Sequence, residues 1–505
     1  MKKIKLYLTL ISVLAITLQS CSLDEEVFGR LNEDDFPISA EDAESTVLFA
    51  YSVYPTLGYY SRNHFYTMHQ ATEEFTQKSD AFQAQIDLDN YLQDRTNDDT
   101  RSSFRHAYIV INRALFIIEN VPNVTMNEEL RNQFVGEGYF LRAHSYYNLV
   151  RLFGQVPLRK ESLASLDDAN LPLSSIEDIY QFIISDLRKA ESLMDFQRRR
   201  GRANKVAAQS LLADAYLFLA SAGQHTDKLP GYEFATPRVN DYYDSAAFFA
   251  GKVINDQSTY TFNNDLISIY NNEALNGPEQ IFSVVASRTD IGALDIAGTL
   301  TTPFFDNLNA VLPEEQGGYV IGPGWQHVWV EIPFYDTYDD SDNRKRLLFG
   351  TEVQVISNDG DTTEYSIANG RMDRPFTLKY LDPGRTSGVD ISGNNYPIIR
   401  YSEVLLTFAE AVGPTPEGFA AINQVRQRAG LDPLSGIVDV QEFREAVYQE
   451  RTWELAYEFQ HLFDLRRLGK MEEVLEGQYG KTIVRNAYYF EIPDTEINQN
   501  PTLGE

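Results

Sequence analysis

Apolar residues recur every three or four positions through most of the first half of the chain and again near its end. Between residues 101 and 121 this spacing places one apolar stripe along an α-helix, so one face of the helix is expected to be buried. The stripe consists of Phe104, Ala107, Tyr108, Ile111, Leu115 and Ile118. The same period predicts helices at 41–57, 128–153, 176–196, 205–222, 242–254, 399–411, 418–429 and 441–468.

Two of the predicted helices share a pattern of a small residue, an aromatic residue and a leucine, each three positions apart. The pattern is Ala143, Tyr146 and Leu149 in one helix and Ala213, Tyr216 and Leu219 in the other, 70 positions later. This offset is close to twice the period of about 34 residues in tetratricopeptide repeats, whose helix pairs bury their faces against neighbouring pairs. The pattern favours a helical-repeat scaffold, with coincidence between two ordinary amphipathic helices as the alternative.

Two segments interrupt the helical pattern. Residues 58–100 are rich in Tyr, Gln, Asn and Asp, and Gly, Pro, Asn and Asp divide residues 224–395 into short β-prone runs. The longer segment exceeds any ordinary loop, so it indicates an inserted subdomain of irregular structure and short strands. The prediction is a mainly α fold: a tetratricopeptide-like N-terminal scaffold at 21–223 with a variable loop at 58–100, the insert at 224–395, and C-terminal helices and tail at 396–505.

Residues 1–20 have the features of a cleaved signal peptide, because three lysines precede a thirteen-residue apolar run at 6–18. A helix of that length is about 20 Å long, which is too short for a hydrocarbon core of about 30 Å. Leu18 and Ser20 lead to Cys21, the only cysteine, in an order that resembles the bacterial lipobox. Cys21 is therefore predicted to carry a lipid anchor; the alternative is a secretory signal with an incidental cysteine.

The net charge and the absence of known catalytic motifs argue against several classes of function. With 43 Lys and Arg against 73 Asp and Glu, the net charge of −30 argues against a nucleic-acid partner. The chain has no GxSxG elbow, HExxH helix, Walker loop or dinucleotide-binding GxGxxG, so we expect no enzyme and no cofactor. Two possibilities stay open: a structural calcium ion held by loop carboxylates, and a pair of catalytic carboxylates, as in glycoside hydrolases, among the 73 acidic residues.

Several strings resemble the SusD/RagB family. The string GEGYFLRAHSYYNLVRLFGQVPL at 136–158 is similar to a helix and turn of that family. Its matching residues are Glu137, Arg142, Ala143, Tyr146, Tyr147, Phe153, Gly154 and Pro157. Three further strings, at 396–431, 450–470 and 492–503, resemble the family's C-terminal helices and tail in the same order, whereas 58–100 and 224–395 show little similarity.

The resemblance implies a lipid-anchored protein on the surface of the bacterial outer membrane that binds a nutrient. Its expected partners are a TonB-dependent transporter of the SusC type and an oligosaccharide or, in some lineages, a peptide. The shared strings themselves are expected to be scaffold. In them we predict that Trp453 is a core residue and that Glu450, Arg466 and Arg467 form ion pairs.

The ligand is expected where flat aromatic rings and polar groups face solvent, because sugar rings present both C–H surfaces and hydroxyls. Trp325 and Trp329 follow a Gly-Pro-Gly sequence in the insert, and either could instead pack the core of the insert. The resemblance points to the loop after the first helix as the second part of the site. The candidate residues are Trp325, Trp329, Tyr59, Tyr60, Tyr66, Glu74 and Asp80.

Three other functions remain as alternatives to a surface glycan-binding protein. They are a peptide-binding member of the same family, a glycoside hydrolase held at the surface, and a helical scaffold whose only ligand is another protein. New reducing ends on a glycan would identify the hydrolase, and the absence of any oligosaccharide binding would favour the scaffold.

Overall fold

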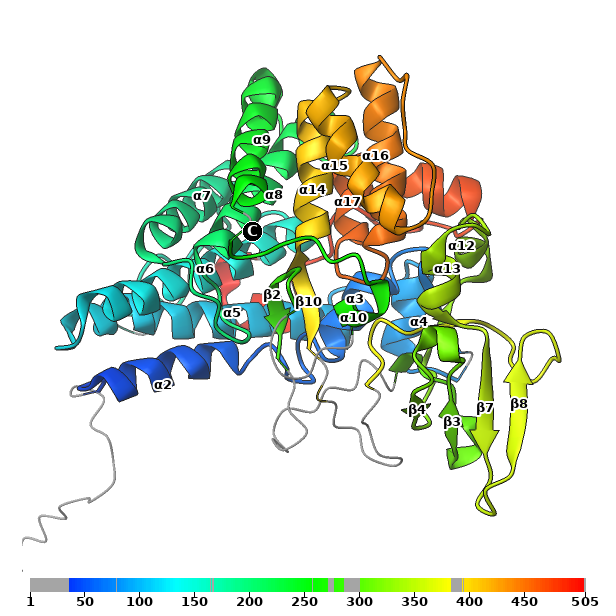
Figure 1. Ribbon diagram of the computed structural model, residues 1–505. Helices are drawn as coiled ribbons and strands as arrows, with labels where there is room; N and C mark the ends of the chain where they lie inside the picture. Colours follow the sequence, from blue (N-terminus) through cyan, green and yellow to red (C-terminus); the bar gives the residue numbers. More distant parts are fainter. Residues whose placement is uncertain are drawn as a thin grey trace, which may run out of the picture.

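A computed structural model describes residues 36–78, 80–163, 165, 168–256, 258–270, 277–285, 300–382, 393 and 395–503. Cys21 and the predicted signal peptide lie outside these residues, so the lipid anchor stays a prediction. Helices fill the upper and left parts of the molecule in Figure 1, and short strands form a smaller lobe at the lower right. The mainly α fold expected from the apolar period is confirmed.

The N-terminal helices form an antiparallel array in which each helix packs against the next one along the chain. Asparagine or serine side chains cap the first turns of several of them, as at Asn97, Asn127, Ser175 and Asn204. The helices are α2 (Ala40–Tyr51), α5 (Asp98–Asn120), α6 (Glu128–Phe153), α7 (Ile176–Leu193), α8 (Lys205–Ala222) and α9 (Val239–Asn255).

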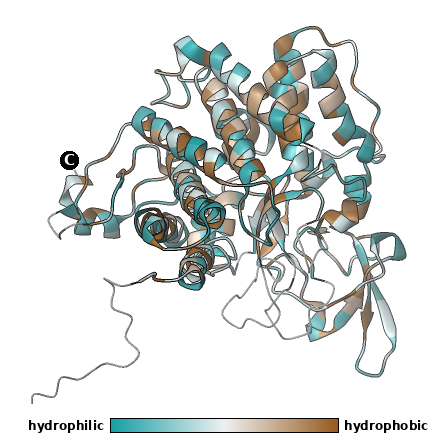
Figure 2. Cartoon of the chain, turned by 60° about the vertical axis from the view of Figure 1, so that its left-hand side comes forward, coloured by the Kyte–Doolittle hydropathy of each residue, from teal (hydrophilic) through white to brown (hydrophobic). Residues whose placement is uncertain are grey.

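The C-terminal helices return to this array. Helix α14 (Tyr401–Val412) packs on both α8 and α9 and also on α15 (Pro416–Arg428) and α16 (Val440–Glu454). One continuous hydrophobic core therefore joins the two ends of the chain. Apolar residues, brown in Figure 2, gather where the helices face one another. Helix α9 is part of this array, so the scaffold continues into the predicted insert as far as residue 255.

The predicted helix at 441–468 is two helices, α16 and α17 (His461–Arg467), with a turn between them. Tyr457 and Phe459 have positive φ angles of 65° and 64°, which an α-helix does not allow. Side chains from distant segments satisfy the freed backbone groups: Glu74 accepts from the Tyr457 amide at 2.7 Å, and Lys379 donates to the Ala456 carbonyl at 2.9 Å. Tertiary hydrogen bonds therefore replace the helical ones here.

Short antiparallel strands occur in the insert, as its β-prone runs predicted. Strand β2 (Gln280–Val284) pairs with β10 (Tyr396–Arg400) beside the scaffold. A four-stranded sheet in the order β4-β3-β7-β8 has a small core of its own. Its strands are β3 (Asn309–Val311), β4 (Val320–Ile321), β7 (Glu352–Ile356) and β8 (Thr362–Ser366). Two smaller pairs are β1 (Phe75–Gln77) with β5 (Val328–Val330) and β6 (Phe349–Gly350) with β9 (Phe376–Thr377).

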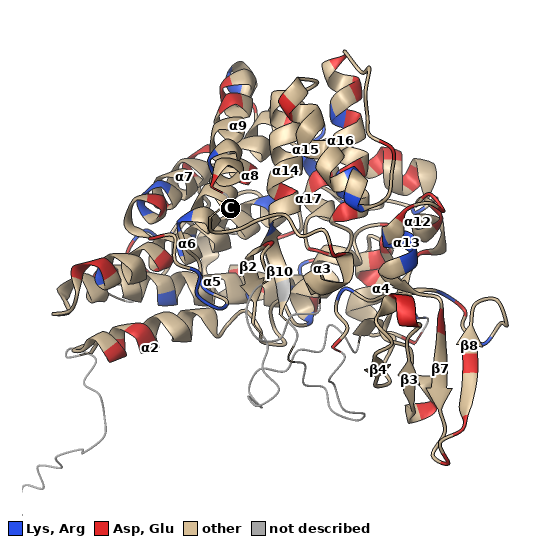
Figure 3. Ribbon diagram, in the orientation of Figure 1, with Lys and Arg blue, Asp and Glu red and all other residues tan. Residues whose placement is uncertain are grey.

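The remaining helices are short. They are α3 (Asn63–His69), α4 (Gln83–Asp89), α10 (Leu266–Tyr270), α12 (Ile332–Asp336), α13 (Asn343–Leu347), the π-helical turn Glu472–Gln478, and α18 (Asp494–Gln499). No helix within the described residues has the long apolar run that crossing a bilayer requires. Acidic side chains, red in Figure 3, are spread over the outer helices and the strand lobe.

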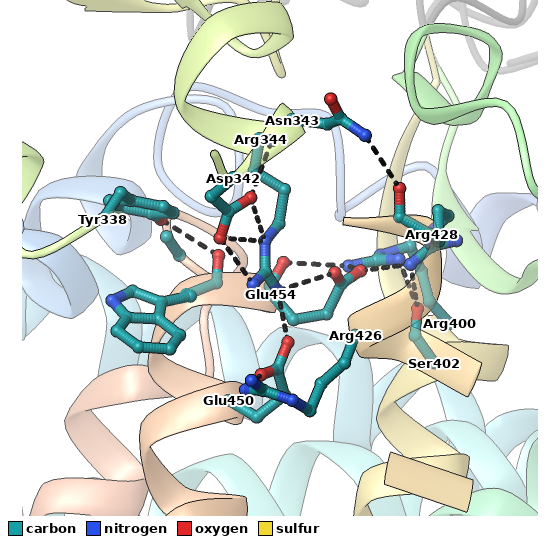
Figure 4. A network of polar contacts seen from close by, with 12 residues as sticks. Tyr338, Asp342, Asn343, Arg344, Arg400, Ser402, Arg426, Arg428, Glu450 and Glu454 are labelled. Atoms are coloured by element: carbon teal, nitrogen blue, oxygen red, sulfur yellow. Dashed lines mark hydrogen bonds and ion pairs between the residues drawn. The ribbon is translucent and has the colours of Figure 1, made fainter. Parts of the chain in front are cut away.

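A buried network of charged side chains joins the insert to the C-terminal helices (Figure 4). Glu454 on α16 accepts from Arg400 at 2.9 Å and from Arg428 at 2.5 Å, and its second oxygen lies 3.2 Å from Arg344 of the insert. Burial alone raises the pKa of the Glu454 carboxyl, but the three guanidinium groups hold it well below its ordinary value. The network thus positions the insert relative to the scaffold.

The ion pairs expected for the C-terminal helices are present at two of the three positions. Glu450 pairs with Arg344 and Arg426, and Arg467 pairs with Glu410 and Asp464. The prediction for Arg466 is wrong, because its guanidinium donates to the backbone carbonyls of Ala487 and Arg151, both at 2.9 Å. Burial without a neighbouring carboxylate lowers the pKa of Arg466 to about 10.

Trp453 is only partly buried, although it packs against the main core. Its indole nitrogen donates to the Thr337 hydroxyl at 3.1 Å, and its ring lies 6.2 Å from that of Tyr338. The indole is therefore held by two residues of the insert, beside the end of α16 at Glu454.

Candidate ligand-binding site

Strands β1 and β5 bring the loop after the first helix next to the insert. They pair antiparallel with Phe75 opposite Val330, Thr76 opposite Trp329 and Gln77 opposite Val328. The two segments selected for the site from the sequence are therefore neighbours in space, although about 250 residues of chain separate them.

Three rings gather at the end of this strand pair, and we call Trp325, His327 and Phe82 the aromatic platform. The centroids of Trp325 and His327 are 5.5 Å apart, and those of Phe82 and His327 are 6.1 Å apart. Trp325 is 39% exposed and Phe82 is 67% exposed, which is unusual for large apolar side chains that lie together. The platform therefore presents flat apolar surface to solvent from both segments.

Polar groups border the platform. Lys78 donates from its ammonium group to the Trp325 carbonyl at 3.1 Å, and Asp80 is exposed two residues further along. The Tyr66 hydroxyl lies 3.4 Å from Nδ1 of His327. Burial, with help from Lys78, lowers the pKa of His327, so its ring is neutral at neutral pH. Charged and hydrogen-bonding groups thus surround an uncharged ring cluster.

Trp329 lies beside the platform and is partly buried. Side chains alternate along a strand, so Trp329 points away from the face of the buried Val328 and Val330. The Arg374 guanidinium lies 4.8 Å from the centre of its ring and also pairs with Glu331 at 3.6 Å. Trp325 therefore lies in a loop and Trp329 in strand β5.

Four candidate residues are buried. Tyr59, Tyr60 and Tyr66 are 0%, 1% and 2% exposed. Glu74 is also fully buried and accepts from His69 at 2.8 Å, and although burial raises the pKa of its carboxyl, the hydrogen bond and charge of His69 lower it below the ordinary value.

These positions correct the expectation that the four side chains face a ligand. Asn148 donates to the hydroxyls of Tyr59 and Tyr60, so both rings are held inside the scaffold. The buried Tyr66 contacts the platform through its hydroxyl, which lies next to the His327 ring. Glu74 accepts a hydrogen bond from the Tyr457 amide in the turn after α16.

Sequence reasoning missed three contributors to this surface, namely Lys78, Phe82 and His327. Phe82 is an apolar residue in a polar stretch directly before α4. An isolated apolar residue in such a stretch could have indicated an exposed ring at the binding surface. Lys78 and His327 carried no signal of their own, because only the strand pairing brings them together.

A buried carboxylate lies under the polar edge of the site. Asp99 accepts from Gln85 at 2.5 Å and from Asn63 at 2.8 Å, and so links α3, α4 and α5. Burial raises the pKa of the Asp99 carboxyl to about 7, against the lowering effects of the Gln85 hydrogen bond and the Arg62 charge.

Replacement of Asp99 by asparagine is expected to change the dependence of stability on pH. The folded-state pKa lies above the unfolded value of about 3.9, so the contribution of Asp99 is fully present below that pH and is lost as the pH rises through about 7. Relative to Asp99→Asn, the wild type should lose up to about 4 kcal/mol of unfolding free energy between about pH 4 and pH 7. Denaturant titrations over this range would measure it, and parallel pH profiles would contradict the assignment.

Among the described residues, no group of three or more His, Cys, Asp or Glu side chains is arranged to hold a metal ion. The surface at the platform instead combines exposed rings with an ammonium group and a carboxylate. Such a surface suits a neutral or weakly charged ligand that has both flat apolar faces and hydroxyls.

The fold and this surface define a helical-repeat binding protein, and the comparisons with known proteins agree. A sequence model described as the SusD family matches residues 331–505, and a second, described as starch-binding associating with outer membrane, matches residues 41–217. The chain belongs to the SusD family. The two matches include the loop at 58–100 and the end of the insert, which from the sequence alone showed little similarity.

Relatives extend over nearly the whole chain. SusD-like protein P2 of Formosa agariphila is 26% identical over 97% of both chains. A structure described as a laminarin binding SusD-like protein has a TM-score of 0.73 at 20% identity and covers 92% of this chain and 98% of its own. A crystal structure with xylogluco-oligosaccharide has a TM-score of 0.74 at 18% identity, with the same coverage. At these identities the two structures establish the fold.

Proposed function

We propose that this protein binds oligosaccharides or polysaccharides at the aromatic platform and delivers them to a SusC-type TonB-dependent transporter in the outer membrane. The observation that carries the proposal is the exposure of Trp325 and Phe82 around His327, where two distant segments meet. Rings exposed in this way lose apolar area from water when a sugar face covers them.

The family and two structural neighbours support a glycan as the ligand. One neighbour is described as laminarin binding and the other as a crystal structure with xylogluco-oligosaccharide. The Lys78 ammonium and the Asp80 carboxylate provide a hydrogen-bond donor and an acceptor at the edges of the rings. Membership of the family and the lipobox-like sequence around Cys21 support a lipid-anchored location at the cell surface.

The affinity expected of this surface is modest. Burying about 100 Å² of apolar ring surface contributes at most about 2.5 kcal/mol before the costs of ordering the ligand. Two exposed rings then give weak, reversible binding, which suits a protein that must release its ligand to a transporter.

Affinity gel electrophoresis with laminarin, xyloglucan and a wider polysaccharide panel tests the proposal. We expect at least one polysaccharide to retard the wild-type protein. Retardation by none of them, together with binding of peptides in calorimetry, would favour the peptide-binding alternative.

The hydrolase alternative is tested on the same samples. We propose that the protein does not cleave glycans, so incubation with the panel should release no new reducing ends. Release of reducing ends that a carboxylate substitution abolishes would replace the binding proposal by a surface glycoside hydrolase.

A further inference from the structure

A large polar cleft lies between the first half of α5 and the C-terminal helix α18, and we call it the α5 cleft. Its volume is about 730 Å³, within the range of about 300–1,000 Å³ that is typical of ligand sites. A second hollow of about 310 Å³ shares Tyr108, Asn112, Glu496 and Gln499 with it. The two hollows therefore form one elongated groove along α5. Figure 1 shows the red C-terminal segment passing beside this helix.

The groove begins close to the aromatic platform. Asn63, the first residue of α3, lines the cleft, and Tyr66 on the next turn reaches His327 of the platform. Three helical residues rise about 4.5 Å, so Asn63 and Tyr66 lie on one side of α3 about one turn apart. Asp99 holds Asn63 in place from the first turn of α5. The near end of the groove and the contact of Tyr66 with the platform therefore lie about one helical turn apart along α3.

The walls of the groove offer hydrogen-bonding groups. Arg105 and Asn112 from α5 face Gln499 from α18, and these three side chains are exposed and make no hydrogen bond to another described residue. Burial raises the pKa of the Glu496 carboxyl, and the charge of Arg105 opposes the rise. Arg101 is already paired with Asp98 and Asp494. The α5 cleft therefore has mixed donors and acceptors, with Arg101 and Arg105 balanced by Asp98 and Glu496.

This lining favours a sugar chain over a peptide. Among the described residues that line the α5 cleft, Ile109 is the one aliphatic side chain. Known peptide grooves use an open strand edge, an apolar surface for an amphipathic helix, or aromatic slots for proline-rich segments. The α5 cleft has amide, guanidinium, carboxyl and phenol groups instead, which match the hydroxyls of a polysaccharide.

We propose that the α5 cleft is a second glycan subsite, which binds the continuation of a chain whose other end lies on the aromatic platform. The substrate class is therefore a linear glycan longer than the platform alone can bind. This inference rests on the proposed function.

Chain-length dependence tests the second subsite. The exposed double variant Arg105→Ala/Gln499→Ala removes one group from each wall, and Gln181→Ala on the exposed surface of α7 is the matched control. The probes are tetrasaccharides and parent polymers of laminarin and xyloglucan, together with any panel member that retards the wild type. We expect the double variant to bind the polymer about tenfold more weakly, a factor that corresponds to about 1.4 kcal/mol. Its tetrasaccharide affinity and its melting temperature should match those of the control.

Three other outcomes would contradict the second subsite, and they differ in what they imply for the proposed function. Equal polymer affinity of the double variant and the control would overturn the second subsite and leave the platform untouched. Loss of tetrasaccharide and polymer binding in parallel would also overturn it, because the cleft would then belong to a single site. If no glycan binds the wild type, the proposed function fails and the inference fails with it.

Discussion

Replacement of Glu454 by alanine is expected to destabilise the protein by about 3–5 kcal/mol, because it leaves buried guanidinium groups without their shared carboxylate. Glu454 is 1% exposed and lies within hydrogen-bonding distance of Arg344, Arg400 and Arg428. Each arginine keeps another carboxylate partner, such as Glu279 for Arg400 and Arg428, but the local charge no longer balances. Chemical denaturation followed by circular dichroism would measure the loss.

An exposed carboxylate on the same helix provides the control. Glu445 forms a surface pair with Lys470 at 3.0 Å, and such pairs contribute at most about 1 kcal/mol, so Glu445→Ala should unfold almost as the wild type does. Similar unfolding midpoints for the two variants would show that the buried network adds little to stability.

Replacement of Trp325 by alanine is expected to remove most of the glycan affinity while the fold is kept. The ring is 39% exposed, so its loss creates no buried cavity and should change the unfolding free energy by about 0.5 kcal/mol or less. The lost apolar contact with a sugar face is roughly 2.5 kcal/mol, or nearly two powers of ten in affinity. Affinity gels and calorimetry with the polysaccharides that retard the wild type would measure the effect.

Phe248 on α9 offers a matched control, because it is 56% exposed and lies on the helical scaffold. Phe248→Ala should bind glycans as the wild type does. If Trp325→Ala retains full affinity, or if both variants lose affinity equally, the platform is not the ligand site.

Much of the scaffold could be predicted from the sequence. The predicted limits of the helices at 128–153 and 205–222 agree with α6 and α8, because the apolar period and the Asn127 and Asn204 caps are both local signals. The break between α16 and α17 could not be predicted. It depends on Glu74 and Lys379, which lie 383 and 77 residues away from their backbone partners Tyr457 and Ala456.

The sequence was sufficient to predict which two segments form the candidate site, but not which of their side chains are exposed there. Trp325 follows Gly324 in a loop-like sequence, and it lies at the exposed surface. Tyr59 and Tyr60 have the composition of a binding loop, yet Asn148 of α6 pairs with both hydroxyls and makes burial of the rings favourable. A tyrosine suits both environments, so only the tertiary partners determine which one it occupies.

The pairing of β1 with β5 has a consequence for how the binding surface forms. Contacts between residues so far apart in sequence close slowly, because the entropy of the intervening chain must be lost first. A polypeptide that stops before residue 328 contains Phe82, Trp325 and His327 but lacks β5, the strand that pairs the two segments. The arrangement of the platform therefore depends on a strand pair that can form only after both distant segments are present.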